Sequence, residues 1–268
     1  DGKRIANTAM YLPAGRFYVH VLGYSSRASW GKTYNLTTNV APGAVETEDN
    51  NATARADVFA LGTKIAGSIF RSASSDDDYF AFDAPAAGKL GLNFTFPVGL
   101  AGSSNQYQIR VRDASGAIVY DFDVVSSDAD GKRLAATAMY LPAGRFYVQV
   151  LGYPSRDSWG KAYSLTATVT PTVAEIEDNG STARANTFGL GAKIAGSTFR
   201  NSSYDDDFYA FDVPSAGKLG LNFTFPAALA GADNQYQLRV RNASGSTLYD
   251  FDLKSADSDG KRLAATAM

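Results

Sequence analysis

The residues best suited to chemistry in this sequence lie in two short acidic segments about thirty positions apart. The first holds Glu46, Glu48 and Asn50, and the second holds Asp76 and Asp78. Carboxylates two positions apart in an extended chain project to the same side, so each segment presents a pair of oxygens. Brought together, the two pairs would repel unless a cation lay between them. Calcium takes about six to eight oxygen ligands from carboxylates, amides and water, so this donor set predicts a calcium site.

The same acidic segments recur 129 positions later. The second copy keeps every one of these carboxylates and the amide, and its candidate ligands are Glu175, Glu177, Asn179, Asp205 and Asp207. The competing interpretation is that these acids form a solvated linker and a turn, as charge clusters on protein surfaces commonly do. Because the spacing and the chemistry are the same in both copies, we favour calcium ligation.

The whole sequence repeats with this period of 129 residues and without a gap. Sliding the chain along itself overlays 139 positions, of which 98 are identical. Solenoid repeats are much shorter, about 20–50 residues, and cannot bury a core alone. Each copy is therefore expected to be an independent domain.

Proline beside small residues marks the expected boundaries between the copies. Such a segment occurs at Ala41–Ala44 and again at Thr170–Val173, and proline interrupts strand pairing and is common in linkers. The boundaries divide the sequence into residues 1–41, the C-terminal part of one repeat, residues 42–170, a complete repeat, and residues 171–268, the N-terminal part of the next.

Two interpretations of the partial repeats stay open. In the first, the sequence is a window from a longer array. In the second, neighbouring chains complement one another, and residues 1–41 of one molecule donate strands to residues 171–268 of the next. The near identity of Asp1–Met10 and Asp259–Met268 weighs against the second interpretation, because both segments would compete for one position.

Alternating apolar and polar residues predict β-strands. In residues 90–96, leucine and phenylalanine alternate with glycine, asparagine and threonine, the period of two expected for a strand with one buried face. The pattern recurs at residues 219–225. Residues 107–111 and 118–122 alternate in the same way on either side of the turn residues Asp113–Gly116, which predicts a hairpin.

Further strands are expected at residues 16–21 and 34–40, and a hairpin turn is expected at Asp128–Gly131. No segment of ten or more residues carries a convincing helical stripe, so helix should be nearly absent. About eight short strands in a repeat of this length predict an all-β protein made of tandem jelly-roll-like β-sandwich domains.

The composition argues against several functional classes. The chain has a net charge of −2 and no run of like charge, so neither a nucleic acid nor an anionic membrane is expected to bind by electrostatics. No hydrophobic stretch approaches the roughly 20 residues of a membrane helix. Cysteine is absent, and the single histidine, His20, is replaced by Gln149 one repeat later. We therefore predict that the chain is not an enzyme.

Aromatic residues offer a candidate binding face for a surface glycan or a protein ligand. They recur in both copies: Tyr18, Tyr24, Trp30 and Tyr34, then Tyr147, Tyr153, Trp159 and Tyr163. Packing in the core or along a sheet edge is the commoner role for such side chains, and it stays the alternative.

Three motifs in order resemble the bacterial pre-peptidase C-terminal domain, a family related to the collagen-binding domains of bacterial collagenases. The family pattern Glu-x-Glu-x-Asn-Asp is matched by Glu46, Glu48 and Asn50, with Asn51 in place of the final aspartate and Gly180 there in the second copy. The pattern Asp-x-Asp-Tyr-Tyr-x-Phe is matched by Asp76, Asp78, Tyr79, Phe80 and Phe82. The pattern Leu-Pro-Ala-Gly-x-Tyr-Tyr-x-x-Val is matched at residues 12–21 and 141–150.

This resemblance covers the whole central repeat and implies a calcium-binding β-sandwich. The departures at Asn51 and Gly180 remove one carboxylate, which puts a second ion per repeat in doubt but not the first. We expect a non-catalytic structural or adhesive segment of a secreted or surface bacterial protein, an adhesin stalk or extracellular filament with calcium-stiffened modules. The alternative is an accessory substrate-, carbohydrate- or peptide-binding module of a secreted hydrolase. The expected partners are neighbouring repeats or other copies of the chain.

Overall fold

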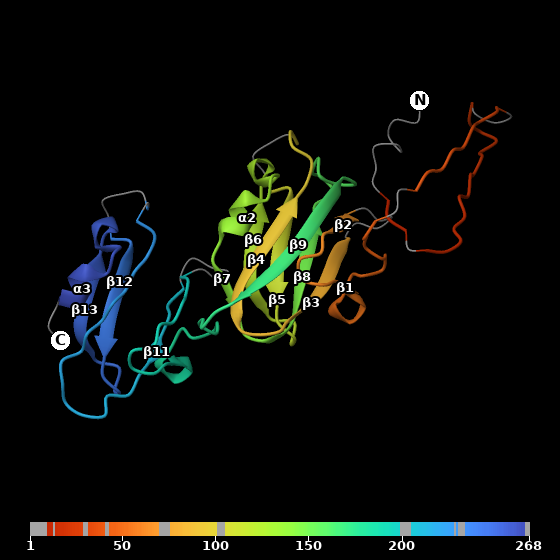
Figure 1. The fold of residues 1–268 in the computed structure, drawn as a ribbon. Coiled ribbons are helices and arrows are strands. Elements are labelled where there is room, and N and C mark those ends of the chain that lie inside the picture. Colours follow the sequence, from red (N-terminus) through yellow and green to blue (C-terminus); the bar gives the residue numbers. More distant parts are fainter. Residues whose placement is uncertain are drawn as a thin grey trace. The chain divides into compact units, whose positions relative to one another are not determined.

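A computed structural model describes residues 10–12, 14–28, 32–40, 43–69, 76–100, 105–198, 205–227, 229 and 234–265, with only the backbone of Leu263. The chain divides into two compact units (Figure 1). Unit 1 comprises residues 1–186 and 193–208, and unit 2 comprises residues 187–192 and 209–268.

The elements of regular structure are short and mostly strands. They are the strands β1 (Asp57–Val58), β2 (Ile65–Ser68), β3 (Asp77–Ala84), β4 (Gly88–Thr95), β5 (Tyr107–Arg112), β6 (Ile118–Val124), β7 (Met139–Leu141), β8 (Gly144–Gly152), β9 (Ala162–Pro171), β10 (Asn186–Thr187), β11 (Tyr209–Ala210), β12 (Tyr236–Arg241) and β13 (Thr247–Leu253), with the helices α2 (Lys132–Ala136) and α3 (Lys261–Ala265) and the 3₁₀ turns η1 (Thr53–Arg55), η2 (Ser126–Asp128), η3 (Thr182–Arg184) and η4 (Ser255–Asp257).

Unit 1 contains two sheets. One has the strand order β1-β3-β8-β5-β6, and the other has the order β2-β9-β4-β7. The pairs are antiparallel apart from β1 with β3. Strand β4 shows why the chain forms these sheets: Leu90, Leu92 and Phe94 are fully buried, and the residues between them are not. Alternation therefore gives each sheet an apolar inner face and a polar outer face.

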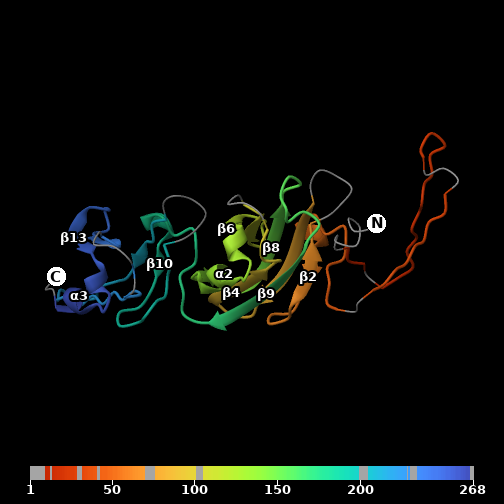
Figure 2. The ribbon, with the colours of Figure 1, turned by 90° about the horizontal axis from the view of Figure 1, so that it is seen from above.

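The two inner faces pack against each other and form one hydrophobic core (Figures 1 and 2). Aromatic contacts join the sheets: the ring centroids of Phe94 on β4 and Tyr107 on β5 are 5.1 Å apart, and those of Phe80 on β3 and Tyr163 on β9 are 6.2 Å apart. Such edge-to-face pairs add to the free energy gained by apolar burial. The prediction of an all-β sandwich is confirmed.

The predicted hairpin is β5 with β6, and unit 2 repeats it as β12 with β13. Tyr107 pairs with Val124 in the first hairpin, and Tyr236 pairs with Leu253 in the second. Both hairpins contain a register shift at the same place, before Arg112 and before Arg241. Closely similar local sequence thus reproduces the same hairpin in both units.

Three predicted strands are absent at their described positions. No strand is assigned to residues 16–21, 34–40 or 219–225. One repeat away, the equivalent residues 145–150, 163–169 and 90–95 lie in β8, β9 and β4. A strand needs a hydrogen-bonding neighbour. In the complete repeat, β4 pairs with β7 and β9, whereas no partner strand for residues 219–225 occurs among the described residues.

The hairpin turn predicted at Asp128–Gly131 was wrong, because this segment joins η2 to α2. The carboxylate of Asp128 accepts hydrogen bonds from Val125 N–H, at 2.9 Å, and from the Arg133 side chain. The carboxylate of Asp130 accepts one from Lys132 N–H at the start of α2, at 3.1 Å. These contacts direct the chain into a helical turn. No helix in the described part of the chain is long and apolar enough to cross a membrane.

Candidate metal centre

Glu46 is held against β2 by its own backbone. Val45 forms a parallel bridge with Ala66, and Glu46 N–H donates to the carbonyl oxygen of Ala66 at 2.9 Å. The first carboxylate oxygen, Oε1, accepts hydrogen bonds from Ser68 N–H at 2.8 Å and from the Ser68 hydroxyl at 3.3 Å. The carboxyl group of Glu46 is completely buried. The linker is thereby fastened to its own sandwich.

Tyr163 on β9 connects the two acidic segments. Its hydroxyl donates to Oδ2 of Asp78 and also lies 3.3 Å from Oε2 of Glu46. Asp78 and Glu46 come from β3 and from the linker, and both are fully buried. One hydroxyl proton cannot serve two carboxylates, so a proton held on Glu46 would satisfy the second contact.

Three carboxylates converge beside this contact. Glu48, Asp76 and Asp78 each place an oxygen within 4.8 Å of the others; Glu48 is exposed and the two aspartates are buried. Asn50 is buried beside β3, where its backbone carbonyl oxygen accepts a hydrogen bond from Tyr79 N–H at 3.1 Å. The five candidate ligands of the first copy therefore lie around the start of β3.

Some side-chain oxygens in this region are buried without a hydrogen bond to any of the described residues. Oδ1 of Asn50 and Oδ1 of Asp78 are among them. The amide nitrogen of Asn50 donates to Oδ2 of Asp57 at 3.0 Å, and this contact fixes which way the amide oxygen points. Buried polar atoms normally have a partner, and an unpartnered one calls for an explanation such as a bound ion or water.

The carboxyl groups of this centre have raised pKa values. Burial raises the pKa of Glu46 from 4.5 to about 8, and the charges of Glu48 and Asp76 add to that rise. Burial also raises the pKa of Asp78 well above its usual range, and the negative charge of Glu46 is the second-largest cause of the rise. A cation bound here would favour the ionised forms and reverse these shifts.

The second copy rebuilds the same linker and loop. Glu175 accepts hydrogen bonds from Ser197 N–H at 2.6 Å and from the Ser197 hydroxyl at 3.4 Å, as Glu46 does from Ser68. Phe208 N–H donates to the carbonyl oxygen of Asn179 at 3.2 Å. Both Glu175 and Asn179 are buried, and Oδ1 of Asn179 has no hydrogen bond within the part of the chain that the structure describes.

The charges of the second copy also converge. The pKa of Asp207 is raised to about 8. Burial is the largest cause, and the negative charges of Glu175, Asp205 and Glu177 raise it further. Among the described residues, the close group of three carboxylate oxygens is found in the first copy and not in the second. The second centre thus has the same residues in a looser arrangement.

A tyrosine of the complete repeat reaches the second centre. The Tyr120 hydroxyl, from β6, donates to Oε1 of Glu177 at 3.3 Å and also contacts the backbone of Tyr140. The sequence placed neither Tyr120 nor Tyr163 at an acidic centre, and it offered Tyr163 only as part of the aromatic binding face. Tyr120 is 57 positions from Glu177 and Tyr163 is 85 positions from Asp78. Their recurrence among apolar strand residues was the one signal available.

Asn51, the departure from the family pattern, has a structural role in the loop. Its side-chain oxygen accepts a hydrogen bond from Asp77 N–H at 3.2 Å, which ties the linker to the start of β3. Gly180 at the same place in the second copy has no side chain to make this contact.

The aromatic residues do not form one exposed face in the complete repeat. Tyr163 is 2% exposed and belongs to the core, and Trp159 is half-buried and packs against it. Core packing, the alternative stated for these residues, is thus correct for Tyr163. Trp30 lies outside the described residues.

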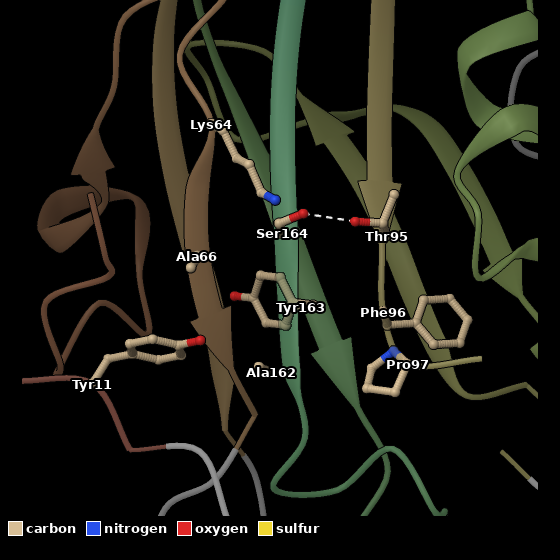
Figure 3. Close-up of a pocket in the computed structure, with 9 residues that line it drawn as sticks. All are labelled: Tyr11, Lys64, Ala66, Thr95, Phe96, Pro97, Ala162, Tyr163 and Ser164. Atoms are coloured by element: carbon tan, nitrogen blue, oxygen red, sulfur yellow. Dashed lines mark hydrogen bonds between the residues drawn. The ribbon is translucent and has the colours of Figure 1, made fainter. Parts of the chain in front are cut away.

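A separate pocket of about 310 Å³ lies beside the ends of β2, β4 and β9 (Figure 3). Its polar groups include Lys64, Tyr11 and the hydroxyls of Thr95 and Ser164, whose oxygens are 2.6 Å apart. Of its nine lining residues, Tyr163 also contacts the acidic centre. The lining contains no carboxylate, so this pocket does not add ligands to the centre.

Gly67 leaves the space in which the Glu46 and Tyr163 side chains meet. A Cβ atom on Gly67 would lie 2.3 Å from Oε2 of Glu46 and 2.4 Å from the Tyr163 hydroxyl. We expect Gly67→Ala to lower the free energy of unfolding by about 1–3 kcal/mol, the usual cost of overpacking a core. Urea unfolding would measure it. Gly189→Ala is the control, since an added Cβ there meets nothing within 4 Å; equal stability losses in both variants would contradict the packing argument.

Fold and site together define a β-sandwich repeat with a buried acidic centre where the linker joins the domain. No protein-family model matches the chain, and no curated protein sequence does. Among solved structures, the chain is similar to the pre-peptidase C-terminal domain of a collagenase from Bacillus anthracis, with 14% identity over 48% of this chain and 100% of that one and a TM-score of 0.30. It is also similar to PliG, a periplasmic inhibitor of g-type lysozyme from Salmonella Typhimurium, with 18% identity over 42% of this chain and 98% of that one and a TM-score of 0.28.

Proposed function

We propose that each acidic centre binds calcium and that the chain is a non-catalytic, structural segment of a secreted or surface bacterial protein. One observation above all supports the proposal: three carboxylates, two of them buried, converge beside side-chain oxygens that have no hydrogen bond to any of the described residues. Asn50 Oδ1 and Asp78 Oδ1 are among those oxygens. Calcium is the cation best suited to a site of carboxylate and amide oxygens with an exposed edge.

The electrostatic surroundings support a missing cation. Exposed acids elsewhere in the chain pair with arginine, as Asp83 does with Arg145 at 2.6 Å. The charges that most affect Glu46 and Asp78 are instead those of other carboxylates. Uncompensated carboxylates in a protein interior are costly, and a divalent ion would compensate several of them at once.

The family and the mechanical role complete the proposal. The three sequence motifs favour membership in the pre-peptidase C-terminal domain family. Each centre joins a linker to its domain, and the Tyr120–Glu177 contact joins one repeat to the linker of the next. Calcium bound there would stiffen the joint, so an array would serve as an adhesin stalk or an extracellular filament. Many copies would multiply any weak adhesion through avidity.

Calorimetric titration with calcium tests the proposal. We expect about two ions per chain, one for each centre. Glu48→Gln should weaken calcium binding at the first site and Glu177→Gln at the second, each by about tenfold or more in affinity, because ligand charge sets calcium affinity. The double variant should bind calcium weakly at both centres.

The matched control is Asp83→Asn, which removes an exposed carboxylate that is paired with Arg145. It should leave calcium binding unchanged. If titration of the parent chain with calcium releases or absorbs no heat, and a chelator has no effect, the calcium proposal is wrong. The interpretation as a solvated linker and turn would then be favoured.

A further inference from the structure

The N-terminal segment has the alternating apolar residues of a buried strand, but these side chains are largely exposed. Phe17, Val19 and Val21 are 50%, 60% and 47% exposed. One repeat later the same side chains lie on β8 and are 3%, 0% and 0% exposed: Phe146, Val148 and Val150. The segment therefore has a strand sequence that a sandwich core would bury.

The hairpin of unit 2 has the complementary deficiency. Strand β5 pairs with β6 on one side and with β8 on the other. Its counterpart β12 pairs with β13, and no other partner of β12 occurs among the described residues. Leu238 and Val240 of β12 are only half-buried, whereas Ile109 and Val111 of β5 are completely buried. An open strand edge beside an apolar face invites an added strand.

We propose that residues 14–40 of one copy of this chain complete the sandwich begun by residues 187–265 of a second copy. Residues 15–23 would take the place of β8 beside β12, and residues 33–40 would take the place of β9. We assign another copy of this chain as the occupant, because its N-terminal segment has nearly the sequence of the strand that fills this place in the complete repeat. Residues 16–21 and 145–150 differ at one position, His20 against Gln149.

The complete repeat fixes the register of the proposed pairing. Arg110 on β5 lies opposite Gln149 on β8, and Val111 lies opposite Val148. By the repeat, Arg239 of one chain should lie opposite His20 of the other, and Val240 opposite Val19. Phe17, Val19 and Val21 would then all enter the core, since a strand's side chains alternate between faces.

The donated segment would also complete the second acidic centre. Tyr163 contacts both Glu46 and Asp78 through its hydroxyl. Its counterpart in the N-terminal segment is Tyr34, which is 68% exposed. In the assembled pair, Tyr34 of one copy would contact Glu175 and Asp207 of the other. The strand exchange itself does not depend on calcium, so it can be tested whether or not the centres bind metal.

The competition noted for the chain ends does not affect this pairing. Residues 1–10 and 259–268 duplicate each other, but residues 14–40 recur only at 143–169, inside the complete repeat. Because the donor and acceptor are different surfaces, the contact is head-to-tail and can continue into a filament.

Disulfide trapping between two single-cysteine chains tests the proposal, because the native chain has no cysteine. His20→Cys chains are mixed with Arg239→Cys chains, oxidised at several protein concentrations, with calcium and with a chelator, and analysed by non-reducing electrophoresis. We expect a covalent dimer containing one chain of each kind in both conditions. The control partner is Gln237→Cys, two residues out of register, which should cross-link far less.

A second pair of variants separates burial from mere proximity. Val19→Lys places a charge where the core would be and should prevent assembly, whereas Tyr18→Lys, on the opposite strand face, should permit it. Light scattering would report both results. Chains that stay monomeric at every concentration, equal cross-linking to residues 239 and 237, or a disulfide that forms only within a His20→Cys/Arg239→Cys double variant would each overturn the proposal.

Discussion

Replacing Asp78 with asparagine is expected to stabilise the calcium-free protein and to abolish its response to calcium at the first centre. Burial holds the pKa of Asp78 well above its ordinary value of 3.8. If the buried carboxyl stays protonated, each pH unit above 3.8 costs the folded state about 1.36 kcal/mol relative to the unfolded chain. Asparagine has the same shape and no such cost, so the calcium-free variant should be more stable than the parent chain at pH 7.

Calcium should stabilise the parent chain at this centre but not the variant. At a free concentration about 100 times the dissociation constant, calcium stabilises a one-site protein by about 2.7 kcal/mol. Asp78→Asn should lose this gain at its centre, and Asp207→Asn should lose it at the second. Urea unfolding of each variant in calcium and in chelator would measure both effects. An unchanged calcium response in Asp78→Asn would remove Asp78 from the ligand set.

Asp83→Asn controls for the loss of any aspartate from β3. Asp83 is exposed, and its hydrogen bonds from Arg145 lower its pKa. Its replacement should therefore bring no stabilisation in chelator. A gain as large as that of Asp78→Asn would show that general charge reduction, not relief of a buried carboxyl, explains the first result.

Strands whose pattern is local could be predicted from the sequence. The alternation in residues 90–96 correctly predicts β4, and the hairpin of β5 and β6 follows from the turn residues between them. In that turn, Oδ1 of Asp113 accepts a hydrogen bond from Ser115 N–H at 2.9 Å, and Gly116 adopts a φ of 86°. The turn chemistry of aspartate and glycine is a property of neighbouring residues, so the sequence suffices.

Strands that depend on distant partners could not be predicted in the same way. Residues 16–21 and 145–150 are identical at all but one position, yet the second segment is a strand and the first is not. The difference lies in the neighbours, since β8 is bordered by β3 and β5. A period-two pattern therefore states that a segment can be a strand, and pairing decides whether it is one.

The candidate centre likewise has a part that local sequence predicts and a part that depends on distant contacts. The spacing of Glu46, Glu48, Asp76 and Asp78 identified which side chains could converge, because two-residue spacing is a local property. That Glu46 and Asp78 meet through Tyr163 depends on the packing of the linker, β3 and β9. No local pattern specifies that contact.

The stability of the calcium-free protein should fall as the pH rises from about 4.5 to about 8. The pKa of Glu46 is raised from 4.5 to about 8 in the folded state. Over this window the folded protein holds a proton that the unfolded chain has released, so the stabilisation is complete below pH 4.5 and is lost as pH approaches 8. A shift of this size corresponds to on the order of 5 kcal/mol by proton linkage. Asp207 should add to the trend in the second copy.

Calcium should remove most of this pH dependence, because the ion replaces the proton as the group that compensates the buried carboxylates. Melting temperatures recorded from pH 4.5 to 8 in calcium and in chelator would show curves that separate as the pH rises. Glu46→Gln should flatten the chelator curve, since glutamine can still accept the hydrogen bond from Ser68 N–H. Parallel curves, with a constant effect of calcium at every pH, would mean that proton and ion do not compete for the same centre.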